Sequence, residues 1–172
     1  AQRLRQYTTG TFAGIFSQQS NVAIDNRMVV FNIRDLEDEL RPIAMYITLS
    51  HIWNKVRTDQ RKRMLIVDEA WQLMKYPDSA NFMFSLAKRA RKYYLGLTTI
   101  TQDVEDFMGS EMGRAIVANA SMQILLKQSP SAVDVLGQVF KLTDEELKRL
   151  SSFPVGQGLF FAGQSHVHIQ IT

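Results

Sequence analysis

Two adjacent carboxylates, Asp68 and Glu69, directly follow a short apolar run, Met64–Val67. Such a run predicts a buried strand, so both acids are expected at its carboxyl end, where open α/β sheets bind ligands. An aspartate there can hold Mg²⁺ through a water molecule while the metal bridges the β- and γ-phosphates of ATP. A glutamate one residue further on can orient the water that attacks the γ-phosphorus. Asp68 is therefore the candidate Mg²⁺-associated residue, and Glu69 is the candidate catalytic residue.

A third polar side chain, Gln102, follows the next expected strand, Leu95–Thr101. Neighbouring parallel strands end at the same edge of a sheet, so we expect Gln102 close to the two carboxylates. Its amide group could contact the γ-phosphate or the attacking water. We therefore interpret Gln102 as a sensor of the bound nucleotide.

A simpler explanation of the acidic pair remains open. Negative charge is favourable at the N-terminus of a helix, so Asp68 and Glu69 could merely cap the helix that follows them. A dipeptide is too short to decide between the two roles, because short motifs match by chance. The position of Gln102 two elements later favours the catalytic role.

A basic cluster ends the helix expected at Ser79–Tyr94 and includes Arg89 and Arg91. Ring-forming motors insert an arginine from one subunit into the neighbour's ATP site, where it stabilises charge in the transition state. Either arginine could act in this way. Cations also stabilise the C-terminus of any helix, and this ordinary role is the alternative for each of them.

From Met28 onward, short apolar runs alternate with longer amphipathic stretches, the pattern of a parallel sheet flanked by helices. Strands are expected at Met28–Ile33, Met64–Val67, Leu95–Thr101, Met122–Lys127, Gly158–Ala162 and Val167–Ile171. Helices are expected at about 42–56, 79–94, 112–120, 131–140 and 143–151, with a turn or short helix at 103–107. The fold class is thus α/β, with a mostly parallel sheet and a C-terminal antiparallel hairpin. Residues 1–27 have no clean period and are expected to form a loop or short hairpin leading into a core at 28–172.

Bulk composition fits one ordinary domain of 172 residues, 45% of them hydrophobic. No apolar run approaches the roughly 20 residues needed to cross a bilayer. The absence of cysteine excludes a disulfide framework and any cysteine-based metal site. The chain begins at Ala1 rather than Met, which suggests a piece of a longer protein.

Several segments resemble one family of motors. LIVDEAW at Leu65–Trp71 and TQDVEDF at Thr101–Phe107 resemble the VirB/Tra-type ATPases of type IV secretion and conjugation systems, specifically the fourth VirB component. The likeness extends to GTFAGIFSQQSNV at Gly10–Val22, NASMQILLKQSP at Asn119–Pro130 and GQGLFFAG at Gly156–Gly163. The DEA element by itself is shared with the wider HerA/FtsK group of DNA-pumping motors.

This resemblance implies a RecA-like P-loop NTPase core that binds ATP and Mg²⁺. It implies a hexameric or other oligomeric ring in the bacterial cytoplasm, peripheral to the inner membrane, that works with other secretion-channel components on a DNA or protein substrate. By motif match Asp68 and Glu69 carry over as the Walker B pair, Gln102 carries over as the sensor, and Arg89 and Arg91 match a basic stretch before the sensor strand.

One feature of the family is missing, because no Gly-x-x-x-x-Gly-Lys pattern occurs in the chain. Without this Walker A loop the phosphates lack their cradle of backbone N–H groups, and we expect the 172 residues alone to hydrolyse ATP poorly or not at all. The leading hypothesis is an ATP-hydrolysing motor subunit of type IV secretion or conjugation. The alternatives are a DNA translocase of the HerA/FtsK type and a non-catalytic RecA-like docking module.

Overall fold

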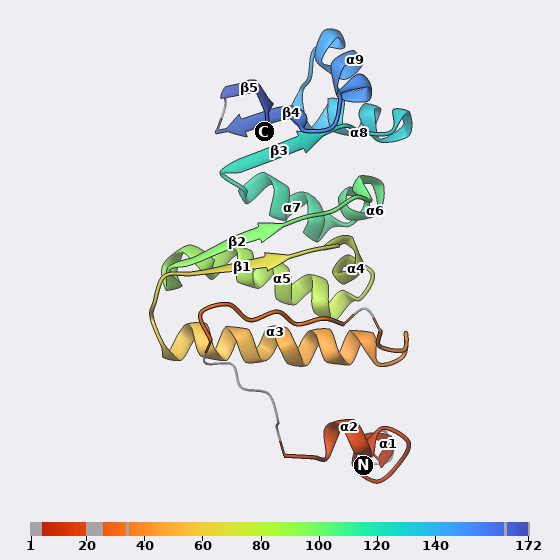
Figure 1. The fold of residues 1–172 in the computed structure, drawn as a ribbon, viewed down its shortest axis with the longest axis vertical. Coiled ribbons are helices and arrows are strands. Elements are labelled where there is room, and N and C mark those ends of the chain that lie inside the picture. Colours follow the sequence, from red (N-terminus) through yellow and green to blue (C-terminus); the bar gives the residue numbers. More distant parts are fainter. Residues whose placement is uncertain (1–4, 20–25, 34, 164, 172) are drawn as a thin grey trace. The chain divides into compact units, whose positions relative to one another are not determined.

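The computed structural model describes residues 5–19, 26–33, 35–163 and 165–171 (Figure 1). By its internal contacts the chain divides into two compact units, Ala1–Asn32 and Ile33–Thr172. The prediction that a leading segment gives way to the core between residues 27 and 28 remains a prediction. None of the described helices is long and apolar enough to cross a membrane.

The first unit contains two one-turn helices, α1 (Arg5–Thr8) and α2 (Ala13–Phe16). They pack through aromatic rings, since Tyr7 stacks on Phe12 and meets Phe16 edge to face. The short hairpin considered for residues 1–27 was wrong for the described part of this segment, because the local hydrogen bonds close helical turns instead. The remainder of that prediction falls on residues 1–4 and 20–25, which lie outside the described part.

The strand predicted at Met28–Ile33 is also not formed. Its residues have the composition of a strand, but no other described strand forms a ladder with them. Met28 and Val30 are therefore 81% and 74% exposed. A strand is stable only when its backbone groups are paired, so apolar composition alone does not produce one.

The second unit carries the alternating strands and helices. In chain order its elements are α3 (Arg41–Thr58), β1 (Arg63–Val67), α4 (Trp71–Met74), α5 (Pro77–Arg89), the 3₁₀ helix η2 (Ala90–Tyr93), β2 (Leu95–Thr99), α6 (Val104–Gly109), α7 (Glu111–Asn119), β3 (Met122–Leu126), α8 (Pro130–Phe140), α9 (Asp144–Ser152), β4 (Gln157–Ala162) and β5 (Ser165–Gln170). β1 and β2 form a parallel pair, whereas β3, β4 and β5 form an antiparallel sheet that ends in a hairpin. The predicted α/β class with a C-terminal antiparallel hairpin is confirmed.

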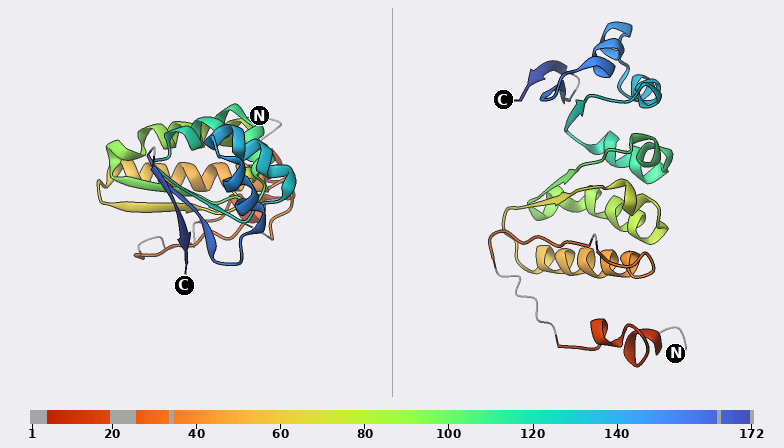
Figure 2. Two further views of the ribbon diagram at one scale, coloured as in Figure 1. Left: turned by 90° about the horizontal axis from the view of Figure 1, so that it is seen from above. Right: turned by 45° about the vertical axis from the view of Figure 1, so that its right-hand side comes forward.

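Helices cover one face of the parallel pair. Leu65 and Leu97 lie opposite each other in register and pack with Met83 of α5 into the cores beneath the sheet. Figure 2 shows α5 and α7 on this side of the strands. The alternate side chains Met64 and Ile66 point the other way and are 71% and 58% exposed. Their exposure shows that no described segment covers this second face of β1. Parallel strands are normally buried on both faces, so this uncovered face is unusual.

A second core lies under the antiparallel sheet, where Leu136 of α8 and Leu150 of α9 pack against Phe161 of β4. Thr143 is followed three residues later by Glu146, the sequence pattern of a capping box, and the structure forms this box at the start of α9. The Thr143 hydroxyl accepts from the Glu146 backbone N–H, and the Glu146 carboxylate accepts from the Thr143 backbone N–H at 2.8 Å. The backbone hydrogen bond to Thr143, followed by the Thr143 hydroxyl and His166, holds the pKa of Glu146 below its ordinary value despite some desolvation.

This lowered pKa predicts a specific pH dependence of stability. A carboxyl whose pKa is lower in the folded chain stabilises the fold above its unfolded pKa, here 4.5, and that contribution is lost as the pH falls through the folded value. Glu146→Gln keeps an N3 capping residue but removes the charge. We expect wild type to melt at a higher temperature than the variant above pH 4.5, and the gap to shrink as the pH falls below that value. Thermal unfolding followed by circular dichroism would show a constant gap if Glu146 carried no such charge effect.

Candidate functional site

The acidic pair lies in the turn that follows β1, at the carboxyl end of the parallel pair. Asp68 is exposed, and its Oδ1 accepts from the Glu69 backbone N–H at 2.9 Å. Glu69 is half-buried, and its Oε2 accepts from the Trp71 indole N–H at 2.6 Å. One carboxylate is therefore open to a metal or water, and the other is held by a neighbouring ring.

The backbone of Glu69 is left-handed, with φ at 50°. Among the described non-glycine residues, Tyr94 and Lys141 also have positive φ, but each of them caps the C-terminus of a helix, where this conformation is common. Glu69 caps no helix C-terminus. A glutamate in this region costs on the order of 1–3 kcal/mol, and such strain is concentrated at functional sites.

The structure argues against the capping explanation of the acidic pair. Ala70 occupies the N-cap position of α4, and no side chain caps that helix. Neither carboxylate accepts from an α4 backbone N–H, because Asp68 bonds the amide of Glu69 and Glu69 bonds a side chain. A four-residue helix also has little dipole to stabilise.

Gln102 lies in the turn after β2, and the backbone of this turn runs beside that of the acidic turn. The Ile100 N–H donates to the Val67 carbonyl, and the Ala70 N–H donates to the Ile100 carbonyl, both at 2.9 Å. The Gln102 side chain is exposed and has no hydrogen-bond partner among the described residues. The structure thus brings the two turns together but joins no carboxylate to the amide group.

Hydrogen bonds fix the turn that carries Gln102. Asp103 caps α6, its Oδ1 accepting from the Asp106 backbone N–H at 3.0 Å. The Thr101 hydroxyl donates to the Asp103 carbonyl at 3.1 Å. The position of the Gln102 backbone is therefore set on both sides, while its side chain keeps rotamer freedom for a ligand.

Trp71 was not among the site residues expected from the sequence. Trp71 is only half-buried, and it lies between two charged groups: its N–H bonds Glu69, and the Lys75 ammonium sits 4.1 Å from its ring centroid. The available signal was its spacing, since a donor two residues after a candidate catalytic glutamate can reach back to it.

The candidate arginines lie at the other end of the parallel pair. Arg89 ends α5 and Arg91 lies in η2, immediately before β2 begins, and both are exposed. Asp68 and Glu69 follow the end of β1, which runs parallel to β2. Within one chain the structure does not bring these arginines to the acidic pair.

Among the residues that the structure describes, no three acidic or histidine side chains form a metal-binding group. The two histidines of β5 have other contacts: His166 contacts Glu146 and stacks on Phe161, and His168 stacks on Phe153. At the acidic pair, Mg²⁺ would therefore have at most the two carboxylates of Asp68 and Glu69 as protein ligands from the described part of the chain. Mg²⁺ is commonly bound in this way, by one or two carboxylates, several waters and the phosphates of a nucleotide.

Comparisons with known proteins point to one family. The family model described as TraG P-loop domain matches residues 2–157. The chain is 30% identical over 148 residues to protein TraC of Escherichia coli strain K12, covering 80% of this chain and 17% of TraC. It is 33% identical over 82 residues to the DNA import protein CedB of Sulfolobus acidocaldarius, covering 44% of this chain and 14% of CedB.

A solved structure extends the likeness to the fold. VirB4 of Thermoanaerobacter pseudethanolicus matches with a TM-score of 0.87 and 30% sequence identity, over 98% of this chain and 48% of VirB4. The chain thus spans about half of that VirB4 chain and less than a fifth of TraC or CedB. The resemblance to VirB/Tra-type ATPases and the P-loop NTPase fold expected from it are confirmed.

Proposed function

Since this chain belongs to the TraG P-loop domain family, we propose that it is part of an ATP-hydrolysing motor that energises type IV secretion or conjugative transfer. The observation that carries the proposal is the turn at the end of β1, where Glu69 adopts a left-handed backbone and presents its carboxylate beside an exposed Asp68. Backbone strain of this kind is found mainly at functional sites, where it holds a side chain in the orientation that the site requires.

Each residue of the turn has a distinct role in the proposed site. Asp68 would hold a hydrated Mg²⁺ that accompanies ATP, and the metal would supply charge neutralisation at the phosphates. Glu69 accepts a hydrogen bond from the attacking water and orients it. Trp71 acts as a positioning residue, because its indole N–H fixes the Glu69 carboxylate until a ligand competes for it. Gln102 completes the site by hydrogen bonding to the γ-phosphate or the water.

The phosphates also need a cradle of backbone N–H groups, which these 172 residues do not encode as a Gly-x-x-x-x-Gly-Lys motif. We propose that a further segment of the full protein supplies this loop. The exposed apolar face of the parallel pair supports the proposal, since Met64 and Ile66 of β1 are both more than half exposed. A covering segment would bury them as sheets in this fold class require.

The wider assignments are also proposals. A ring of copies would let Arg89 or Arg91 of one copy reach the acidic pair of the next, which suits their position at the opposite end of the parallel pair. Such a ring would work at the cytoplasmic face of a bacterial inner membrane with other channel components. Its substrate would be DNA or protein.

The direct test is phosphate release by the protein extended to include the phosphate-binding loop. We expect turnover with ATP and Mg²⁺, and a fall to background when EDTA removes the metal, because Asp68 contributes through the ion. We expect the 172 residues alone to show no turnover above background. Turnover that survives metal removal would contradict the proposed role of Asp68.

The similarity to CedB, whose name describes DNA import, favours a second candidate, a DNA translocase that uses the same carboxylates. Duplex DNA that stimulates turnover severalfold and binds tightly with a steep salt dependence would support it. If duplex DNA did not change the rate of ATP turnover, the secretion motor would be the better description.

A further inference from the structure

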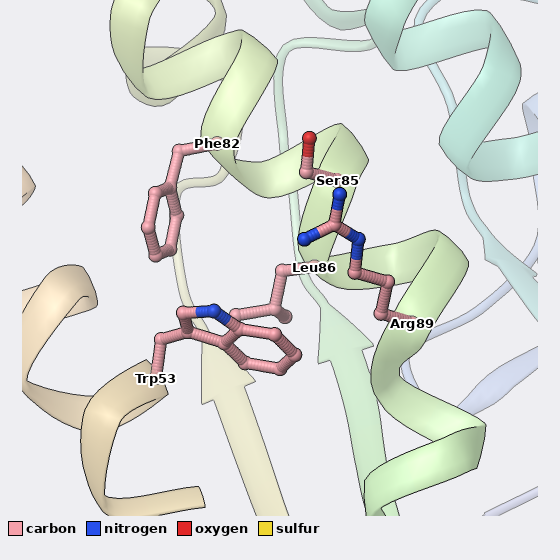
Figure 3. A pocket seen from close by; sticks show the side chains of 5 residues that line it. All are labelled: Trp53, Phe82, Ser85, Leu86 and Arg89. Atoms are coloured by element: carbon pink, nitrogen blue, oxygen red, sulfur yellow. The ribbon is translucent and has the colours of Figure 1, made fainter. Parts of the chain in front are cut away.

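A small pocket lies between α3 and α5. Trp53 of α3 and Phe82, Ser85, Leu86 and Arg89 of α5 line a space of about 170 Å³, which includes its open mouth (Figure 3). Because this volume includes open solvent, the hollow is shallow and could admit the tip of a side chain but not a nucleotide. Its lining contains neither the acidic pair nor Gln102, so the pocket is separate from the nucleotide site proposed above.

The polar groups of the pocket are mainly hydrogen-bond donors. They are the Trp53 indole N–H, the Ser85 hydroxyl and the Arg89 guanidinium, and the lining contains no carboxylate. Within the described part of the chain, none of these three groups has a hydrogen-bond or ion-pair partner. A guanidinium beside two further donors matches a ligand that offers acceptors and negative charge, and a carboxylate meets both requirements.

The remaining wall of the pocket is apolar and fixed in place. Phe82 meets Tyr46 edge to face with ring centroids 6.1 Å apart, and Trp53 meets Tyr93 edge to face at 5.0 Å. These contacts hold the two rings, so the wall is formed before any ligand arrives. Together with Leu86 they offer an aliphatic or aromatic side chain a surface to pack against.

The surroundings of the pocket are strongly basic. Residues 54–63 and 86–95, which carry the ends of α3 and α5, contain nine Lys and Arg and a single acid, Asp59. The whole chain, by contrast, has twenty Lys and Arg against seventeen Asp and Glu. Asp59 already pairs with Arg61 and Arg63. The region therefore attracts an acidic partner and repels a basic one.

We propose that this pocket docks a short acidic segment of a partner protein. An aspartate or glutamate carboxylate of that segment binds Arg89 and Ser85, and an adjacent aliphatic side chain packs on Phe82 and Leu86. Nucleic acid fits less well, because its bases need open ring faces in succession, whereas these rings are half-buried in edge contacts with their neighbours. The assignment leaves Arg91 as the arginine available to act on a neighbouring copy.

The test measures fluorescence polarisation of a fluorescein-labelled peptide, Gly-Glu-Asp-Leu-Glu-Asp-Gly, added to the protein at physiological salt. Arg89→Gln is compared with Arg91→Gln, which removes the same charge two residues away but outside the pocket. We expect Arg89→Gln to weaken binding at least about tenfold and Arg91→Gln less than about threefold, because a contacting charge contributes more than a peripheral one. A peptide with serine in place of leucine should also bind more weakly.

A second measurement locates the peptide. The chain has two tryptophans, so in Trp71→Phe the remaining emission comes from Trp53 in the pocket, and the peptide should shift it. Equal weakening of peptide binding by the two arginine variants would overturn the proposal, since the peptide would then be attracted by the general positive charge of the region and not by the pocket. Two further results would also overturn it: tighter binding of a single-stranded oligonucleotide with the same dependence on Arg89, or a change of oligomeric mass in Arg89→Gln without a change in peptide affinity.

Discussion

Glu69→Gln is expected to lower ATP turnover of the protein extended to include the phosphate-binding loop by about 100-fold or more, with little effect on ATP binding. Glutamine has the shape of glutamate, and its amide oxygen can still accept from the Trp71 indole N–H, so the turn should keep its geometry. The loss would then come from the missing negative charge, which the attacking water needs for orientation and activation. Phosphate release under saturating ATP measures the effect, and nucleotide binding is followed separately.

Glu105→Gln is the matched control. Glu105 lies in the first turn of α6, near the turn of Gln102, is exposed, and has no hydrogen bond to a described residue. It loses the same charge without touching the site, so its turnover should stay within about twofold of wild type, as for most surface substitutions. Equal turnover in wild type and Glu69→Gln would remove Glu69 from the chemistry and leave a docking module as the better account.

Asp68→Asn is expected to raise the Mg²⁺ concentration needed for half-maximal turnover about ten- to hundredfold. An aspartate that holds a metal through water acts from the outer shell, and loss of such partners typically costs this much in metal affinity. Asparagine keeps the oxygen that accepts from the Glu69 backbone N–H, so the turn itself should persist. A titration of turnover against Mg²⁺ at fixed ATP gives the midpoint directly.

Asp106→Asn serves as the control for this second variant, because Asp106 is an exposed acid of α6 that takes part in capping only through its backbone N–H. Its Mg²⁺ midpoint should match wild type. If Asp68→Asn lost turnover while its Mg²⁺ midpoint stayed the same, Asp68 would act on something other than the metal.

Much of the second unit could be predicted from local patterns. The run at Met64–Val67 and the capping box at Thr143 are complete within a few residues, and the structure forms both. The acidic pair was found for the same reason, because an apolar strand that ends in Asp and Glu is a local signal. The parallel pairing of β1 with β2 could also be predicted, because a helix-length stretch separates the two strands along the chain.

Features that depend on distant partners could not be predicted. Met28–Ile33 has a strand composition, but a ladder needs a second backbone, and none of the described strands provides one. The role of Trp71 depends on the left-handed backbone of Glu69, which brings the carboxylate to the indole. The pocket at Trp53 depends on how α3 packs against α5. Tryptophan is most often buried, so the sequence alone indicates no role in a site for either Trp53 or Trp71.

The most direct test of the account is a structure of the extended protein, as the Glu69→Gln variant, with ATP and Mg²⁺. We expect nucleotide at the carboxyl end of β1 and β2, a hydrated metal beside Asp68, and the side chain of residue 69 facing the γ-phosphate through a water. Nucleotide bound elsewhere, with the side chain of residue 69 still on Trp71 and no metal near Asp68, would contradict it.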